Sequence, residues 1–75
     1  MSIQVRFFAS LREQQGREQT VVSGAADVAG VWAAATEGAE PPANALAAVN
    51  MAYADWDSPV ADGDEVAFFP PVTGG

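Results

Sequence analysis

The chain has 75 residues and a net charge of −7, and 49% of its residues are hydrophobic, including 16 alanines. One small domain is expected at this length, because the larger apolar side chains fill a single core and leave none for a sheltered catalytic cleft. The sequence lacks cysteine, histidine and lysine, which excludes disulfides, thiolate and imidazole chemistry, Schiff bases and P-loop phosphate binding.

The first elements form a hairpin with a wide connection. Residues 3–9 alternate between apolar and polar side chains, which predicts a half-buried strand. A short helical turn is expected over residues 10–16, with Ser10 as its cap and Gly16 at its end. Residues 18–22 are rich in β-branched side chains and predict a second strand that pairs antiparallel with the first.

The main helix is predicted over residues 27–37. Asp27 is a favourable N-cap, and apolar side chains recur after it at the helical spacing i, i+3, i+4 and i+7. Trp32 is the largest member of this stripe and is assigned to the core. Gly38 suits the position just beyond the helix end.

The second half of the chain returns to strands. Residues 40–44 form a loop, residues 46–50 and 51–55 are the arms of a tight hairpin, and residues 65–69 form the last strand. This order predicts an α+β fold, a β-grasp (ubiquitin-like) roll in which a mixed sheet of four or five strands packs on one main helix. Another α+β roll or a split sandwich is the alternative. Residues 1–75 are assigned to this single domain.

The end of the sequence has the features of an extended reactive arm over residues 70–75. Pro70 and Pro71 hold the backbone extended after the last strand, and six residues reach about 20 Å. Gly74 and Gly75 have no side chain and fit a narrow tunnel. These features predict a flexible tail that delivers a bare carboxylate into another protein's active site. A frayed terminus is the plainer interpretation of two glycines alone.

Strand parity predicts a second site on the sheet. Phe8 and Phe69 point away from the face that carries Phe7 and Phe68. Because the first and last strands of a β-grasp are parallel neighbours, Phe8 and Phe69 are expected to share the outer face with Tyr53. An exposed aromatic cluster indicates a protein interface. The alternative is that a loop of the same chain covers this face.

Charge and hydropathy restrict the kinds of partner and the cellular location that we expect. The basic residues are Arg6, Arg12 and Arg17, and nine of the ten acidic residues lie from residue 18 onward. Such a surface repels nucleic acid and membranes and suits a basic protein, although solubility explains the charge equally well. The acidic residues lack the spacing of a metal site. We expect a cytoplasmic protein, because no apolar run is long enough for a membrane helix, and the N-terminus lacks the basic region and unbroken apolar run of a signal peptide.

Three motifs resemble the small, sulfur-carrier subunit of molybdopterin synthase, a MoaD-type branch of the ubiquitin-like family. They are DGDEVAFFPPVTGG at 62–75, AAVN at 47–50 and RFFASLRE at 6–13, and the likeness runs along nearly the whole chain. The resemblance implies a β-grasp fold and a role as sulfur carrier in molybdenum cofactor biosynthesis. It implies a non-catalytic subunit that binds no cofactor of its own.

The resemblance also implies a mechanism. An adenylating enzyme of the ubiquitin-activating type uses ATP to activate the carboxylate of Gly75, and a sulfur donor protein displaces AMP to leave a thiocarboxylate. The arm then enters the large catalytic subunit, within a heterotetramer, and donates sulfur to cyclic pyranopterin monophosphate. Arg12 is expected to meet the large subunit beside the aromatic cluster. The residues assigned to partner contacts are Phe8, Arg12, Tyr53, Phe69, Pro70, Pro71, Val72 and Thr73, with Gly74 and Gly75 at the reactive end.

Three other functions stay open. A sulfur carrier for thiamin thiazole synthesis has the same fold and also ends in two glycines. A ubiquitin-like protein modifier forms isopeptide bonds with lysines of its targets. A binding domain without a reactive end uses only the sheet surface.

Overall fold

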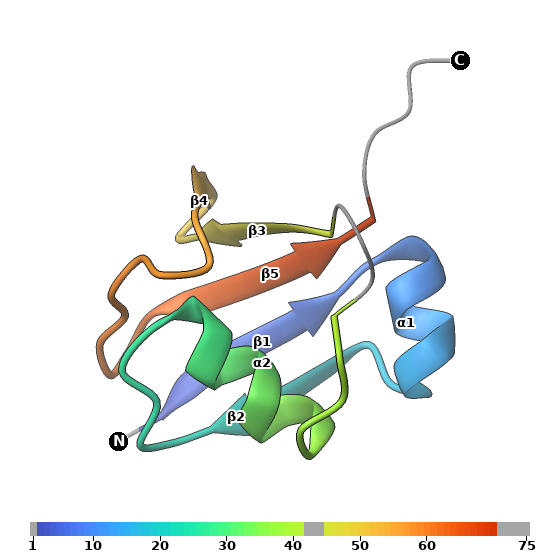
Figure 1. Ribbon diagram of the computed structural model, residues 1–75, viewed down its shortest axis with the longest axis horizontal. Helices are drawn as coiled ribbons and strands as arrows, with labels where there is room; N and C mark the ends of the chain where they lie inside the picture. Colours follow the sequence, from blue (N-terminus) through green and yellow to red (C-terminus); the bar gives the residue numbers. More distant parts are fainter. Residues whose placement is uncertain (1, 42–44, 71–75) are drawn as a thin grey trace.

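Within the part of the chain that is described, five strands form one mixed sheet with two helices beside it (Figure 1). The computed structural model describes residues 2–41 and 45–70. The predicted order is confirmed, and the second hairpin has a return strand. In chain order the elements are β1 (Ile3–Phe7), α1 (Ala9–Gln15), β2 (Gln19–Val22), α2 (Val28–Thr36), β3 (Leu46–Val49), β4 (Ala52–Ala54) and β5 (Glu65–Phe69).

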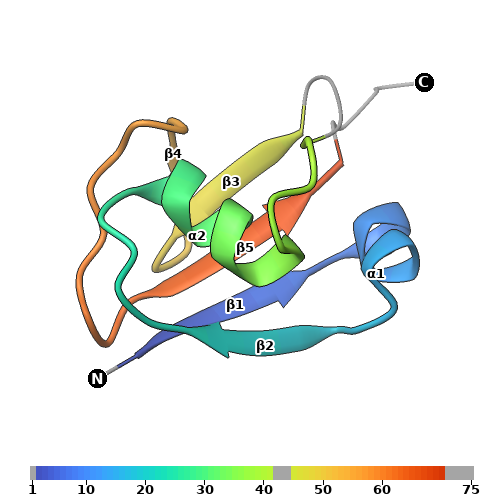
Figure 2. The same cartoon turned by 60° about the horizontal axis from the view of Figure 1, so that its bottom comes forward.

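The strands lie side by side in the order β2-β1-β5-β3-β4. The central pair, β1 and β5, is parallel, and the other neighbouring pairs are antiparallel. α2 crosses one face of the sheet, and α1 lies beyond the end of β1 (Figure 2). This arrangement is the predicted β-grasp roll, in which the first and last strands are parallel neighbours.

The core lies between α2 and the sheet. Along β1, Ile3, Val5 and Phe7 are buried and the residues between them are exposed, which is the period of two expected for a half-buried strand. Trp32 is only 2% exposed, as predicted for the anchor of α2. Its ring meets those of Phe7 and Phe68 in T-shaped pairs with centroid distances of 6.0 and 5.0 Å. Phe7 and Phe68 are therefore core residues, in agreement with their strand parity.

Both ends of α2 are formed as the sequence predicts. The side chain of Asp27 accepts a hydrogen bond of 2.7 Å from the backbone N–H of Gly30, which satisfies one of the free amides of the first turn. At the other end Glu37 adopts a left-handed conformation with φ of 58°. Gly38 follows it, and its N–H donates to the Ala33 carbonyl at 2.9 Å.

The expected cap of α1 at Ser10 is wrong. The helix begins at Ala9, and Phe8 is its N-cap, with an extended backbone and no side-chain hydrogen bond. The sheet explains this start, because the Phe8 N–H donates to the Phe68 carbonyl at 3.1 Å. That bond holds the chain extended until the helix begins. The end of the helix is as predicted, since Gly16 is left-handed with φ of 70°.

Candidate partner-binding face and C-terminal arm

The sheet face opposite α2, called the outer face here, carries the aromatic residues assigned to partner binding. On this face Phe69 of β5 pairs with Leu46 of β3. Ala48 of β3 lies between Ala67 on one side and Tyr53 on the other. Because side chains alternate along a strand, these five residues form an apolar strip from β5 across β3 to β4.

Tyr53 and Phe69 are the aromatic centre of the outer face. Their ring centroids are 5.7 Å apart and their planes are tilted by 53°, which is a favourable aromatic arrangement. Tyr53 is 75% exposed. Phe69 is half-buried, less exposed than strand parity alone predicts, because the Tyr53 ring lies against it and Leu46 flanks it. An exposed aromatic ring that packs against a second, partly buried ring is typical of an interface hot spot.

Phe8 lies on the same side of the molecule but outside this ring pair. It is 45% exposed, so the predicted contrast with buried Phe7 is confirmed. The backbone bond from Phe8 to Phe68 places it beside Phe69 on the neighbouring strand. Among residues 2–41 and 45–70, the ring pairs do not include Phe8. The expected cluster is therefore one tilted pair of rings, Tyr53 and Phe69, with Phe8 next to it.

Arg12 lies one helical turn after Phe8. Its N–H donates to the Phe8 carbonyl at 3.4 Å in the first turn of α1, and the residue is exposed. The backbone thus places Arg12 one turn from Phe8, and its contact with a partner stays a prediction.

The arm begins where β5 ends. Pro70 is half-buried, and β5 is parallel to β1, so the arm starts at the end of the sheet where α1 lies (Figure 1). Phe8 and Phe69 therefore flank its first residue. The remaining predicted residues of the arm lie outside the described residues: Pro71, Val72, Thr73, Gly74 and Gly75.

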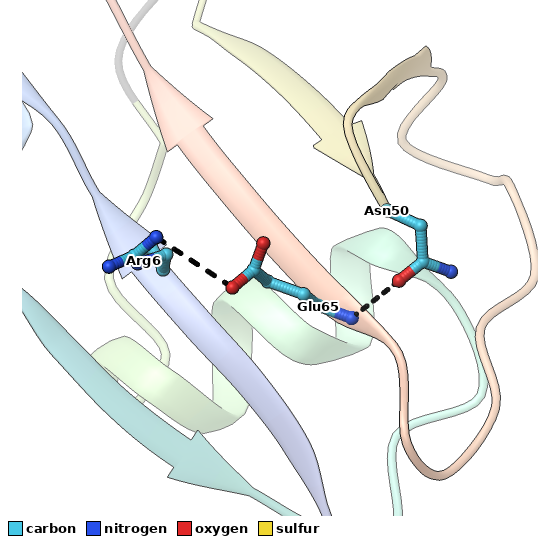
Figure 3. A network of polar contacts seen from close by, with 3 residues as sticks. All are labelled: Arg6, Asn50 and Glu65. Atoms are coloured by element: carbon cyan, nitrogen blue, oxygen red, sulfur yellow. Dashed lines mark hydrogen bonds and ion pairs between the residues drawn. The ribbon is translucent and has the colours of Figure 1, made fainter.

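A polar network that the sequence prediction missed connects the β3–β4 turn to β5. The Asn50 side chain accepts a hydrogen bond from the Glu65 N–H at 3.0 Å and donates to Asp64 Oδ1 at 3.0 Å. Arg6 approaches Glu65 with an Nη1–Oε2 distance of 3.8 Å (Figure 3). In the sequence, the AAVN motif that contains Asn50 indicates a family resemblance and no contact. The partner of Asn50 lies 14 residues away, beyond the reach of local pattern.

Asp64 is the acceptor of this network. Hydrogen bonds from the Asn50 side chain and from the Ala61 backbone hold the pKa of the Asp64 carboxyl below its ordinary value. The pKa falls because both bonds favour the charged form of the carboxyl. The network thus has a charged acceptor, and hydrogen bonds to charged groups are stronger than those between neutral groups.

Among residues 2–41 and 45–70, no group of three or more histidine, cysteine, aspartate or glutamate side chains is placed to hold a metal ion. No helix in these ranges has the length and apolar character to cross a membrane. A hollow of about 360 Å³ adjoins Tyr53 between β3 and β4, with Leu46, Asp55 and Ser58 in its wall. This hollow and the exposed Tyr53 ring together form a surface that a partner can contact.

Residues 5–75 match the ThiS family. The chain therefore belongs to the ThiS family. This ThiS-family chain is 45% identical to the molybdopterin synthase sulfur carrier subunit of Escherichia coli (strain K12), over 97% of the chain and 99% of that relative. The family predicted from the motifs and the β-grasp fold are both confirmed.

Two solved structures share the fold along the whole chain. SAMP1 from Haloferax volcanii has a TM-score of 0.78 and 30% identity, with 100% of each chain covered. The complex of subunits 1 and 2 of the molybdopterin-converting factor from Helicobacter pylori has a chain with a TM-score of 0.69 and 28% identity, again with 100% of each chain covered.

Proposed function

We propose that this chain is the sulfur carrier subunit of a molybdopterin synthase. The observation that carries the proposal is the 45% identity to the Escherichia coli sulfur carrier subunit over nearly the full length of both chains. The geometry supports it, because an exposed aromatic face lies beside the start of the arm. A carrier needs this arrangement, since one contact surface docks the partner and the arm reaches from it into the partner's active site.

The chemistry of the proposal takes place on the carboxylate of Gly75. A carboxylate is a poor acceptor for sulfur, so an adenylating enzyme first joins it to the AMP portion of ATP and releases pyrophosphate. Sulfide delivered by a donor protein then displaces AMP and leaves a thiocarboxylate. The Gly75 carboxylate is itself the nucleophile of the adenylation. The chain lacks histidine and lysine, so the acid and base catalysis of these steps belongs to the partners.

The sulfur is used in the large subunit. There the thiocarboxylate sulfur attacks a side-chain carbon of cyclic pyranopterin monophosphate and displaces an oxygen substituent from it. Hydrolysis of the resulting thioester then returns the carboxylate of Gly75 and leaves the sulfur on the pterin. Two such transfers supply the two sulfurs of a dithiolene. Enclosure of the arm by the partner keeps water from the adenylate and the thiocarboxylate until the transfer.

The outer face provides the docking contact of this complex. Tyr53 and Phe69 form its centre, Phe8 extends it toward β1, and exposed Arg12 adds a charged group one helical turn after Phe8. The proposed partner is the large catalytic subunit, in a heterotetramer. The likeness to a chain of the Helicobacter pylori two-subunit complex supports a complex of this kind.

The proposal is tested by following Gly75 through the reaction. The chain is incubated with adenylating enzyme, ATP and sulfide, and intact mass spectrometry looks for replacement of one terminal oxygen by sulfur. The product is then given to the large subunit with cyclic pyranopterin monophosphate. A chain that gains no sulfur, or whose sulfur never reaches the pterin, contradicts the proposal. The matched control is the chain without Gly75, which should be inactive in both steps and unfold like the wild type.

A second function is favoured by one comparison. SAMP1, whose name denotes a small archaeal modifier protein, shares the fold at a TM-score of 0.78 and 30% identity. As a modifier, this chain would use the same activated carboxylate to acylate lysines of other proteins. Conjugates of higher mass in a reaction with adenylating enzyme and lysate would support this function. Thiocarboxylate without conjugates would favour the sulfur carrier.

A further inference from the structure

The position of Tyr53 depends on a short edge strand. β4 has three residues and pairs with β3 alone, with Tyr53 opposite Ala48. In a strand the side chains alternate, so a slip of one residue would turn Tyr53 from the outer face to the core face. Something other than the pairing of three residues must therefore fix this register.

The β3–β4 turn fixes it at a conformational cost. The strands are joined through Asn50 and Met51, which have φ values of 50° and 71°, and Val49 pairs with Ala52. Two positive φ values in a two-residue connection define the hairpin turn that favours Asn followed by Gly. Asn50 suits the first position, but Met51 occupies the second in a left-handed conformation that residues other than glycine adopt only with strain. A turn under this strain needs an anchor.

Asn50 supplies the anchor through three hydrogen bonds, which we call the Asn50 bracket. Its backbone N–H donates to the Glu65 carbonyl at 2.7 Å, and its Oδ1 accepts from the Glu65 N–H at 3.0 Å. Its Nδ2 donates to Asp64 Oδ1 at 3.0 Å. The other oxygen of Asp64 accepts from the Ala61 N–H at 2.9 Å. The bracket ties the hairpin tip to the start of β5, the strand that carries Phe69 (Figure 3).

We propose that Asn50 is a positioning residue: its bracket to Asp64 and Glu65 sets the β4 register that places Tyr53 on Phe69, and thereby sets the affinity for the large subunit. The identity of that partner rests on the proposed function. A role in stability alone is a poorer explanation, because β4 is exposed except for half-buried Ala54. Loosening the hairpin therefore removes little core packing and acts chiefly on the outer face.

The first test exchanges the two side chains of the bracket. Asn50→Asp keeps an acceptor for the Glu65 N–H but loses the donor, and places a second carboxylate against Asp64. We expect the affinity for the large subunit to fall about tenfold or more, the effect of losing a hydrogen bond to a charged group. Adding Asp64→Asn restores a donor at position 64 for the carboxylate at position 50. The double variant should return to within about threefold of wild type.

Two readouts separate positioning from a general loss of structure. Affinity is measured by calorimetry with the purified large subunit, and contacts between the Tyr53 and Phe69 rings are followed by NMR on the free chain. Asn50→Asp should lose affinity and the contacts between the two rings, and the double variant should regain the affinity and the contacts. Gln19→Glu on β2 is the matched control, since it adds the same charge at the opposite edge of the sheet, and it should retain both.

A cycle with Tyr53→Ala completes the test. If Asn50 acts through Tyr53, Asn50→Asp should have almost no further effect on affinity once Tyr53 is removed. Equal losses in the presence and absence of Tyr53 would overturn the proposal, as would wild-type binding by Asn50→Asp or no recovery in the double variant. If the wild-type chain fails to bind the large subunit, the proposed function is wrong, and the ring contacts still decide whether the bracket positions Tyr53.

Discussion

Tyr53 combines two properties that residues of a folded domain seldom share. It is 75% exposed, yet its ring rests on another aromatic side chain at 5.7 Å. The contact limits the rotamers of Tyr53 before any partner arrives, so less entropy is lost on binding. Phe69, by contrast, is half-buried and serves both as the base of this contact and as part of the sheet.

Truncating these two residues should separate binding from stability. Tyr53→Ala is expected to weaken binding to the large subunit by about 2 kcal/mol, as at an interface hot spot, and to change the free energy of unfolding by less than about 0.5 kcal/mol. Phe69→Ala should weaken both, because its side chain is partly buried. Calorimetry with the large subunit and urea unfolding of the free chain provide the two measurements. Equal destabilisation by both variants would contradict this division of roles.

The Asp64 carboxyl predicts a pH dependence of stability. Its hydrogen bonds hold its pKa below the ordinary value of 3.8, so the folded state favours the charged form. The stabilisation that this lowered pKa provides is fully present above 3.8, the pKa of the unfolded state. It is lost as the pH falls from 3.8 through the lower pKa of the folded state. The difference in unfolding free energy between wild type and Asp64→Asn should therefore be constant near neutral pH and shrink in acid. A difference that grows with acidification would mean that the pKa is raised.

At the scale of elements, the β3–β4 hairpin shows where sequence patterns succeed and where they end. The sequence predicts both arms, over residues 46–50 and 51–55, but it assigns Asn50 and Met51 to the strands, whereas in the structure these two residues form the turn between them. The left-handed conformation of Met51 has no local signal, since methionine is not a turn residue. Asn50 could be read as a turn residue, but its bond to Asp64 arises only when β3 and β5 become neighbours.

The other differences have the same origin. Residue preference predicts the cap of α1 at Ser10, but a backbone bond from Phe8 to β5 sets the cap at Phe8, two residues earlier. Phe69 was placed on the outer face correctly by parity, but its partial burial depends on Tyr53 from a different hairpin. The period of apolar side chains and the preference for a capping residue can be read from neighbouring residues. Side-chain exposure and cross-strand hydrogen bonds depend on the assembled sheet.

A substitution in the β3–β4 turn should raise the stability of the fold. Met51 is 93% exposed and has φ of 71°, so Met51→Gly relieves backbone strain without removing core packing. We expect the free energy of unfolding to rise by about 0.5–1 kcal/mol, after allowing for the greater freedom of glycine in the unfolded chain. Urea unfolding of wild type and variant measures this difference. Met51→Ala is the control, because it removes the same side chain but keeps the strain, and it should give no comparable gain.

At the scale of the whole molecule, the basic side chains and a cluster of acidic side chains lie in different regions of the fold. The three arginines belong to the β1–α1–β2 region, where Arg6 is drawn toward Glu65. The segment from residue 55 to residue 65 holds five acidic side chains and no basic one. Asp64 is engaged by Asn50, whereas Asp55, Asp57 and Asp62 are exposed. The exposed carboxylates therefore dominate the field on the side of the molecule away from α1.

This field should steer encounters with partners whose surfaces are basic. Because the Debye length shrinks from about 30 Å at 0.01 M salt to about 10 Å at 0.1 M, the association rate with the large subunit should fall over this range. The dissociation rate should change less, since the outer face and the arm hold the complex. Asp57→Asn with Asp62→Asn should slow association at low salt and leave the Asn50 bracket and the Gly75 chemistry intact. Stopped-flow rates that are independent of salt would mean that the charge of −7 serves solubility and does not guide the encounter.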